Sequence, residues 1–194
     1  MKLCGLTGGV GMGKSTAAGF FLQSGVRLVD TDELAHELVT PGQPALAEIQ
    51  NQFGAHLLAP DGRLKRDELA RLVFADPVAR KQLEHILHPR IRERWQAQVE
   101  AWRQENCALA MVVIPLLFET GAETSFDKII CVACSPAGQQ DRLRARGWPA
   151  EQVAGRVAAQ WPIGQKIARS HFVIWTEGSV GNHRRQVEAI LRTF

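Results

Sequence analysis

The sequence predicts an α/β fold in which a parallel sheet is packed between layers of helices, and two features support this prediction. The first is a glycine-rich loop at residues 8–15, which matches G-x-x-x-x-G-K-S/T and lies between a strand-like and a helix-like segment. The second is the continuous apolar run 108–114, which is typical of a strand buried on both faces.

The loop at residues 8–15 has the composition that phosphate binding requires. Glycines let the backbone turn tightly and approach a ligand, because no Cβ intrudes, and the following helix directs its positive N-terminal end to the same place. Lys14 can reach the β- and γ-phosphates of a nucleoside triphosphate, and the Ser15 hydroxyl can ligate Mg²⁺. The motif predicts triphosphate binding, and a glycine-rich turn that matches the pattern by chance is the alternative.

Composition narrows the class of protein. At 194 residues the chain is expected to form one domain, with room for a smaller inserted subdomain. Its net charge of +3 is too small to imply nucleic-acid binding by itself and suits an anionic small substrate. No apolar run approaches the roughly 20 residues of a membrane helix, and no secretory signal is visible before the glycine loop. We therefore expect a cytoplasmic protein.

The cysteines offer a C-x-x-C spacing at Cys131 and Cys134, which invites a redox or zinc interpretation. The pair lies in a strand-like segment, where positions three apart point to opposite faces of a sheet. There is no second C-x-x-C, and the other cysteines are Cys4 and Cys107. Buried, reduced thiols are the favoured interpretation.

Two aspartates follow the second predicted strand, at 26–29. Asp30 and Asp32 come directly after it, and in open parallel sheets ligands bind beyond the carboxyl ends of the strands. Both carboxylates are therefore expected beside the glycine loop, near a metal or a reacting hydroxyl. The alternative, that either one merely caps the next helix, at 33–38, is compatible with a second role.

Residues 33–107 are predicted to form a helical insertion between the second and third strands, because strand-like segments are missing there. The predicted features are a helix at 45–53, a turn at 60–62, helix starts at Asp67 and at 76–77, and a long helix at about 90–104.

Within this block, His88, Arg90 and Arg92 are expected at one helix start, where a solvated basic face is the simpler interpretation. Trp95 and Trp102 are seven residues apart, so they share a helical face, and core packing is favoured over stacking on a nucleobase.

The rest of the chain returns to the strand and helix pattern. The run 108–114 leads into the loop 115–121, a further strand is predicted at 127–133 and a last one at 172–175, and a closing helix begins near residue 181.

Between the last two strands lies a predicted helical hairpin. On its first helix Arg142 and Arg146 share a face, and Arg144 is turned away from it; the second helix carries Arg156 and Gln160. Inward arginines are what a phosphoryl-transfer lid needs, because it must neutralise charge and exclude water. Surface arginines on ordinary helices are the alternative.

In these residues the chain resembles the dephospho-coenzyme A kinases, over essentially its full length. The resemblance lies in Gly5-Leu6-Thr7-Gly8-Gly9 through Lys14-Ser15-Thr16, Asp30-Thr31-Asp32 with Ala35 and Val39-Thr40-Pro41-Gly42, His88-Pro89-Arg90-Ile91-Arg92, Pro115-Leu116-Leu117-Phe118-Glu119, and Gln140-Asp141-Arg142-Leu143 with Arg146. The glycine loop is common to many kinases, and its conjunction with the other segments is far more specific.

The resemblance implies ATP-dependent phosphorylation of the ribose 3′-hydroxyl of dephospho-coenzyme A, the last step of coenzyme A synthesis. It also implies a P-loop fold like that of the nucleoside monophosphate kinases, with three α/β/α layers and a five-stranded parallel sheet. The core is expected at 1–32, 108–135 and 170–194, a helical coenzyme A-binding insertion at about 33–107, and a lid at about 136–165.

Site residues are carried over from the resemblance by position. Those expected to hold the ATP phosphates are Gly8, Gly9, Val10, Gly11, Met12, Gly13, Lys14, Ser15 and Thr16, with Arg146 from the lid. Asp32 is implied as the base on the hydroxyl, and Lys14 and Arg142 act with it in catalysis. Mg²⁺ is expected on Ser15 and Asp30. The implied substrate contacts are Asp30, His88, Arg92, Leu117 and Glu119.

Two departures from the family pattern stand out. Thr31 occupies the middle of a triplet that is more often Asp-Ala-Asp. Near the C-terminus, His171 stands where the family usually has Asp before the last strand, and Trp175-Thr176 where it has Asn after it. The second departure leaves the adenine pocket without assigned residues.

The expected partners are two small molecules, ATP and dephospho-coenzyme A, with no nucleic acid and no membrane, and the chain is expected to be a monomer or a weak homo-oligomer. One rival is a kinase for another metabolite, such as a nucleotide or sugar acid. A second rival is a nucleotide-dependent switch or nucleic-acid-associated ATPase, which the near-neutral charge and the lack of a basic tail disfavour.

Overall fold

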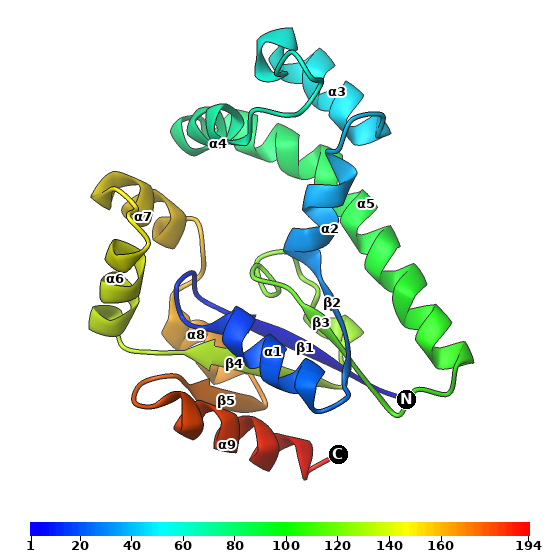
Figure 1. Cartoon of the computed structure of the whole chain (residues 1–194), viewed down its shortest axis with the longest axis vertical. Helices are drawn as coiled ribbons and strands as arrows, with labels where there is room; N and C mark the ends of the chain where they lie inside the picture. Colours follow the sequence, from blue (N-terminus) through cyan, green and yellow to red (C-terminus); the bar gives the residue numbers. More distant parts are fainter. The chain divides into compact units, whose positions relative to one another are not determined.

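The computed structural model describes all 194 residues, which fall into two compact units. A sheet unit comprises Met1–Asp30 and Ala101–Phe194, and a helical unit comprises Thr31–Glu100. The sheet unit is made of two chain segments, one before and one after the helical unit in the sequence, so the helical unit is an insertion into the sheet unit (Figure 1).

The sheet unit is built on a five-stranded sheet in which every neighbouring pair is parallel, as predicted. The strands are β1 (Lys2–Gly8), β2 (Arg27–Asp30), β3 (Leu109–Val113), β4 (Lys128–Ala133) and β5 (Phe172–Trp175). Their spatial order is β2-β3-β1-β4-β5, so β1 is central. The residue at its carboxyl end, Gly8, is paired with Val132 of β4, which places the glycine loop in the middle of the carboxyl edge of the sheet.

Helices α1 (Lys14–Gln23) and α9 (Val180–Leu191) pack together and cover one face of the sheet (Figure 1). Their apolar side chains form one core with alternate residues of the strands, which include Cys4, Leu6, Met111, Val113, Ile130, Val132 and Ile174. Helix α8 (Ile163–Arg169) contacts β1 and β4. Near Gly5 the segment after β3 approaches so closely that a Cβ at Gly5 would lie 2.6 Å from Leu117 Cδ1.

Helices α6 (Pro136–Ala145) and α7 (Ala150–Ala158) form the predicted hairpin between β4 and β5. Ser135 caps α6, since its hydroxyl accepts a hydrogen bond from the Gly138 N–H, and Pro136 occupies the first turn. Gly147, with φ of 74°, permits the reversal between the two helices. The short 3₁₀ helix η2 (Glu123–Ser125) precedes β4.

The helical unit consists of α2 (Thr31–Leu38), α3 (Pro44–Phe53), the 3₁₀ helix η1 (Ala55–Leu57), α4 (Arg66–Ala75) and most of α5 (Pro77–Gln104). It has its own apolar core, formed by Leu38, Val39, Ala45, Leu46, Ile49, Leu57, Leu69, Val73, Ala79 and Ile86. An ion pair between Arg90 and Glu48 joins α5 to α3.

The prediction of a helix start at residues 88–92 is wrong, because α5 runs without a break from Pro77 to Gln104 and Pro89 lies inside it. Proline removes one intrahelical hydrogen bond and disturbs the preceding turn. The Arg90 side chain donates a hydrogen bond to the carbonyl of Ile86, which gives that turn an additional donor. Packing against the core of the helical unit holds the helix together where local sequence signals indicated a boundary.

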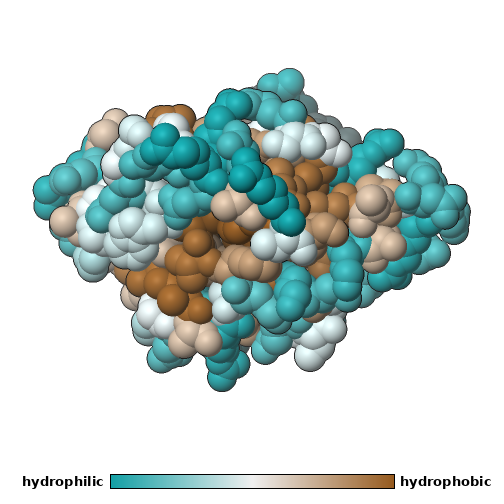
Figure 2. Space-filling model, turned by 90° about the horizontal axis from the view of Figure 1, so that it is seen from below, coloured by the Kyte–Doolittle hydropathy of each residue, from teal (hydrophilic) through white to brown (hydrophobic).

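The face seen in Figure 2 is largely hydrophilic, but apolar side chains are gathered in places on it. The exposed apolar residues of the sheet unit include Leu22, Val173 and Val180, of which Val180 is 67% exposed.

No helix is both long enough and apolar enough to cross a membrane. Trp95 and Trp102 are both buried, which confirms that they pack into the protein interior.

All four cysteines are free thiols. Cys131, in β4, and Cys134, just beyond it, are buried, and burial raises the pKa of the Cys131 thiol to about 11. Such a thiol stays protonated at neutral pH and is a poor nucleophile. The interpretation as buried, reduced thiols is confirmed for this pair. The structure also contains no group of three His, Cys, Asp or Glu side chains that could hold a metal ion.

Candidate active site

The glycine loop requires glycine for steric reasons. Gly8, Gly11 and Gly13 have φ of 146°, 73° and 94°, values that residues with a Cβ rarely adopt. At Gly8 a Cβ would also lie 2.1 Å from the backbone oxygen of Val132 on the neighbouring strand. The loop can therefore run tightly along the sheet only because these positions have no side chains.

The loop leads into α1, whose first turn can accept an anion. Gly13 is the N-cap and provides no side-chain acceptor, and the first turn has no acidic residue. Backbone N–H groups at a helix start without such acceptors are well suited to bind phosphate oxygens. The Lys14 ammonium donates a hydrogen bond to the carbonyl of Gly8 at 3.2 Å, so it lies across the loop. Ser15, next along the helix, is exposed.

Arg142 of the hairpin reaches the same loop through Thr176. Its guanidinium donates to the Thr176 hydroxyl at 2.6 Å and also to the Thr176 carbonyl. The Thr176 hydroxyl in turn donates to the carbonyl of Met12 at 2.9 Å. A cation of α6 is thus held beside the glycine loop by the residue that directly follows β5.

The other arginines of the hairpin take different positions. Arg146 lies exposed at the C-terminal end of α6, so in this structure it does not share the environment of Arg142. Arg144 is exposed, lines the hollow between α6 and α7, and pairs with Asp141 and Gln140. The Arg156 guanidinium lies 4.5 Å from the centroid of the Trp148 ring.

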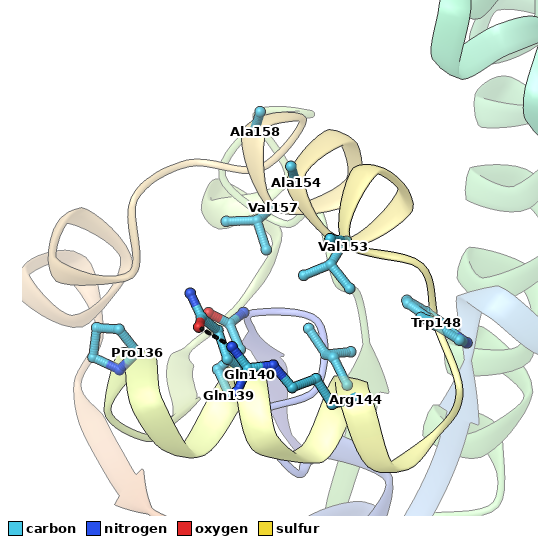
Figure 3. Close-up of a pocket in the computed structure, with 11 residues that line it drawn as sticks. Pro136, Gln139, Gln140, Arg144, Trp148, Val153, Ala154, Val157 and Ala158 are labelled. Atoms are coloured by element: carbon cyan, nitrogen blue, oxygen red, sulfur yellow. Dashed lines mark hydrogen bonds between the residues drawn. The ribbon is translucent and has the colours of Figure 1, made fainter.

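A hollow of about 470 Å³ lies between α6 and α7 (Figure 3). Figure 3 shows Val153, Ala154 and Val157 of α7 facing Gln139 and Gln140 of α6 across it.

The two aspartates lie where strand β2 meets helix α2. Asp30 is the last residue of β2 and pairs in register with Val113, the last residue of β3. Asp32 is exposed in the first turn of α2, which belongs to the helical unit. Asp30 is therefore at the carboxyl edge of the sheet, and Asp32 follows it by two residues.

Leu117 and Glu119 face the protein interior. Leu117 is fully buried in contact with Gly5 of β1. One oxygen of Glu119, Oε1, accepts hydrogen bonds from the Lys166 ammonium and from the Trp161 backbone N–H, each at 2.7 Å. Lys166 is itself fully buried and also donates to the carbonyl of Pro115 at 2.8 Å. This buried pair holds the segment after β3 in place.

Removal of the cation from this pair should destabilise the fold. Breaking a buried ion pair by removal of one partner costs about 3–5 kcal/mol, because a charge is left buried without compensation. We expect Lys166→Met to lower the free energy of unfolding by about that amount in urea titrations. The double variant Lys166→Met/Glu119→Gln should recover part of the loss. A single variant as stable as the parent chain would show that the pair does not support the fold.

His88 and Arg92 lie on α5 in the helical unit. His88 is partly buried, and burial lowers the pKa of its imidazole, with Glu84 acting in the opposite direction. The side chain is therefore neutral at pH 7. Arg92 is exposed.

The departure from the family pattern near the C-terminus involves His171 and Thr176, and each has a structural role. His171 Nδ1 accepts a hydrogen bond from the Ile129 backbone N–H at 3.1 Å, and the His171 backbone N–H donates to the Ile129 carbonyl, so His171 joins the starts of β4 and β5. A carboxylate could accept the same bond. Thr176 links Arg142 to the loop, as described above. Sequence reasoning missed this role, because Thr176 contacts residues that are far away along the chain.

Comparisons with known proteins converge on one family. The family model described as Dephospho-CoA kinase matches residues 2–182. The dephospho-CoA kinase of Syntrophotalea carbinolica is 41% identical over 192 residues, which cover 98% of this chain and 91% of that protein. Among solved structures, TT1252 from Thermus thermophilus has a TM-score of 0.84 at 32% identity and covers 100% of this chain and 97% of that one. The dephospho-CoA kinase from Campylobacter jejuni has a TM-score of 0.72 at 26% identity, with 99% and 96% covered.

Proposed function

The chain belongs to the dephospho-CoA kinase family, and from that premise we propose which of its residues carry out the reaction. The chain is a kinase that phosphorylates the ribose 3′-hydroxyl of dephospho-CoA with ATP to give CoA, the final step of CoA biosynthesis. The single observation that best supports a site assignment is the glycine loop at the centre of the sheet edge, with Lys14 across it and Arg142 beside it.

The ATP phosphates are bound by the loop and the start of α1, at residues 8–16. Backbone N–H groups there supply donors, the helix start supplies partial positive charge, and Lys14 supplies a full charge. Charge develops on the transferring phosphoryl group and on the leaving ADP, so Lys14 and Arg142 stabilise the transition state more than the ground state.

The residues present also fit Mg²⁺, the usual partner of ATP. Mg²⁺ prefers oxygen ligands and binds through one or two protein groups plus substrate phosphates. Ser15 provides an exposed hydroxyl in the first turn of α1, and Asp30 ends β2 at the same sheet edge. When bound, the ion would neutralise charge on the phosphates.

Asp32 orients the 3′-hydroxyl and accepts its proton. Phosphoryl transfer in kinases passes through a loose transition state, so little proton abstraction is needed early and the carboxylate acts chiefly by positioning. Asp32 is exposed at the start of α2, where a substrate can reach its side chain.

The remaining substrate contacts are assigned to the helical insertion, including His88 and Arg92. Leu117 and Glu119 contribute indirectly, because both are directed into the protein and hold the segment after β3. The α6–α7 hairpin serves as the lid. We further propose that the chain acts in the cytoplasm as a monomer or weak homo-oligomer, without nucleic-acid or membrane partners; its net charge of +3 agrees with small anionic substrates.

The test is a coupled assay with purified chain, Mg-ATP and dephospho-CoA, with the product identified by mass and by the position of the new phosphate. CoA is a matched control acceptor, because its 3′-hydroxyl is already phosphorylated. We expect ADP release and a 3′-phosphorylated product with dephospho-CoA and neither with CoA. Phosphorylation of a mononucleotide but not of dephospho-CoA would contradict the proposal.

A further inference from the structure

Both polar backbone groups of Val10, in the middle of the glycine loop, are hydrogen-bonded to side chains of the lid. The Gln139 amide nitrogen Nε2 donates to the Val10 carbonyl at 2.7 Å. The Val10 N–H donates to Gln160 Oε1 at 3.0 Å. Gln139 lies in the first turn of α6, and Gln160 lies two residues beyond the end of α7. The two ends of the hairpin therefore meet on one residue of the loop.

These two bonds restrict a backbone that glycine would otherwise leave free. Val10 lies between Gly9 and Gly11, and glycine has access to far more backbone conformations than other residues. Gln139 is only 8% exposed, so water cannot readily replace its contact with the loop. Rotation of the Val10 backbone would leave the buried Gln139 amide without this partner, and an unsatisfied buried donor is costly.

The same ends of the hairpin have further connections. Gln160 is followed by Trp161, whose backbone N–H donates to Glu119. The Trp161 ring stacks on Phe118, with 6.1 Å between the ring centroids. At the other end, Gln139 lies on the same helix as Arg142, which reaches the Met12 carbonyl through Thr176. The glutamine contacts thus connect the loop to the lid on one side and to the segment after β3 on the other.

We infer that Gln139 and Gln160 are positioning residues for phosphoryl transfer, which fix the Val10 backbone and hold the lid in register with the glycine loop. This inference rests on the proposed binding of the ATP phosphates by residues 8–16. When either bond is lost, the lid hairpin is less well placed over the γ-phosphate and water has better access to it. Transfer to dephospho-CoA falls, and the fraction of ATP hydrolysed without transfer rises.

Gln139 is the donor in its bond to Val10, whereas Gln160 is the acceptor in its bond. Replacement of glutamine with glutamate therefore has different expected effects at the two positions. Glutamate in place of Gln160 can still accept from the Val10 N–H. Glutamate in place of Gln139 loses the donor and sets a carboxylate against the Val10 carbonyl. Both variants add the same charge near the loop. Gln140→Glu is the matched control, because Gln140 is exposed on the same helix and contacts Arg144 instead of the loop.

We expect Gln139→Glu to lower kcat for transfer about 10- to 100-fold, as a misplacement of about 1 Å does, and to raise the ratio of ATP hydrolysis to transfer. Gln160→Glu should lose much less in kcat, and Gln140→Glu should match the parent chain. A merely structural role would lower hydrolysis and transfer in parallel and leave their ratio unchanged. Equal kcat and equal ratios in Gln139→Glu and Gln160→Glu would overturn the inference.

The Gln139→Glu variant could fail to fold, and thermal melts would reveal this. In that case Gln139→Met and Gln160→Met, which keep the volume and remove the hydrogen bond without adding charge, are compared with the parent chain. Both should show the raised hydrolysis ratio, and an unchanged ratio in both would reject the positioning role. Failure of the parent chain to phosphorylate dephospho-CoA would instead contradict the proposed function, so the two failures are distinguishable.

Discussion

Replacement of Lys14 with alanine should lower kcat by about 10³-fold, because one preorganised charged donor to the transferring group is lost in a site that excludes water. The Lys14 ammonium lies across the glycine loop, 3.2 Å from the Gly8 carbonyl, and no other residue of the loop carries a charge. The fold should persist, since the side chain is not part of the apolar core. Steady-state kinetics with dephospho-CoA and a thermal melt measure both quantities.

Lys2→Ala is the control for this substitution. Lys2 is exposed at the first position of β1, the strand that leads into the loop, and it lies at the opposite end of that strand. Its removal changes the net charge by the same amount and should leave kcat unchanged. Near-normal turnover in Lys14→Ala would contradict the assignment of the loop as the phosphate site.

Substitution of Asp32 should have the next largest effect. General-base and positioning groups typically contribute about 10²- to 10⁴-fold to the rate. We expect Asp32→Ala to lower kcat within that range, with little change in KM for ATP. Asp32→Asn should retain more activity, because an amide oxygen can still accept a hydrogen bond from the hydroxyl although it cannot take a proton. Initial rates with dephospho-CoA varied at saturating ATP, and with ATP varied at saturating dephospho-CoA, separate these effects.

Glu33→Gln is the matched control, since Glu33 is the next residue of α2 and is also exposed. It should behave like the parent chain. If Asp32→Ala kept its activity, the base would have to be sought elsewhere, and Asp30 at the end of β2 would be the next residue to replace.

Sequence reasoning predicted the parts of this fold that local signals determine. The five strands were predicted because each is a short apolar segment with a turn or helix signal beside it, and the loop was predicted because its glycines and Lys14 have a fixed spacing. The start of α5 was predicted from its proline at 77, but its continuation through Pro89 was not, because tertiary packing overrode a local breaker.

Contacts between distant residues could not be predicted from the sequence in the same way. Lys166 neutralises Glu119 across 47 positions, and Thr176 meets Met12 across 164. Nothing in the immediate surroundings of either residue indicates its partner. Gln160 was noted only as part of the second lid helix, and its bond to Val10 depends on how the hairpin returns to the sheet. Residue types at fixed spacing indicated the phosphate site. The side chains that contact the glycine loop from elsewhere in the chain, such as Thr176 and Gln160, were identified only from the three-dimensional structure.

In the proposed reaction, the glycine loop and Asp32 hold the γ-phosphate and the acceptor hydroxyl against each other. A crystal structure with Mg²⁺, a non-hydrolysable ATP analogue and dephospho-CoA measures this arrangement directly. We expect the triphosphate along residues 8–16, with the ribose 3′-oxygen about 3–3.5 Å from the γ-phosphorus and within hydrogen-bond distance of the Asp32 carboxylate. A complex in which Asp32 points away from the phosphates, or in which another hydroxyl faces the γ-phosphate, would contradict it.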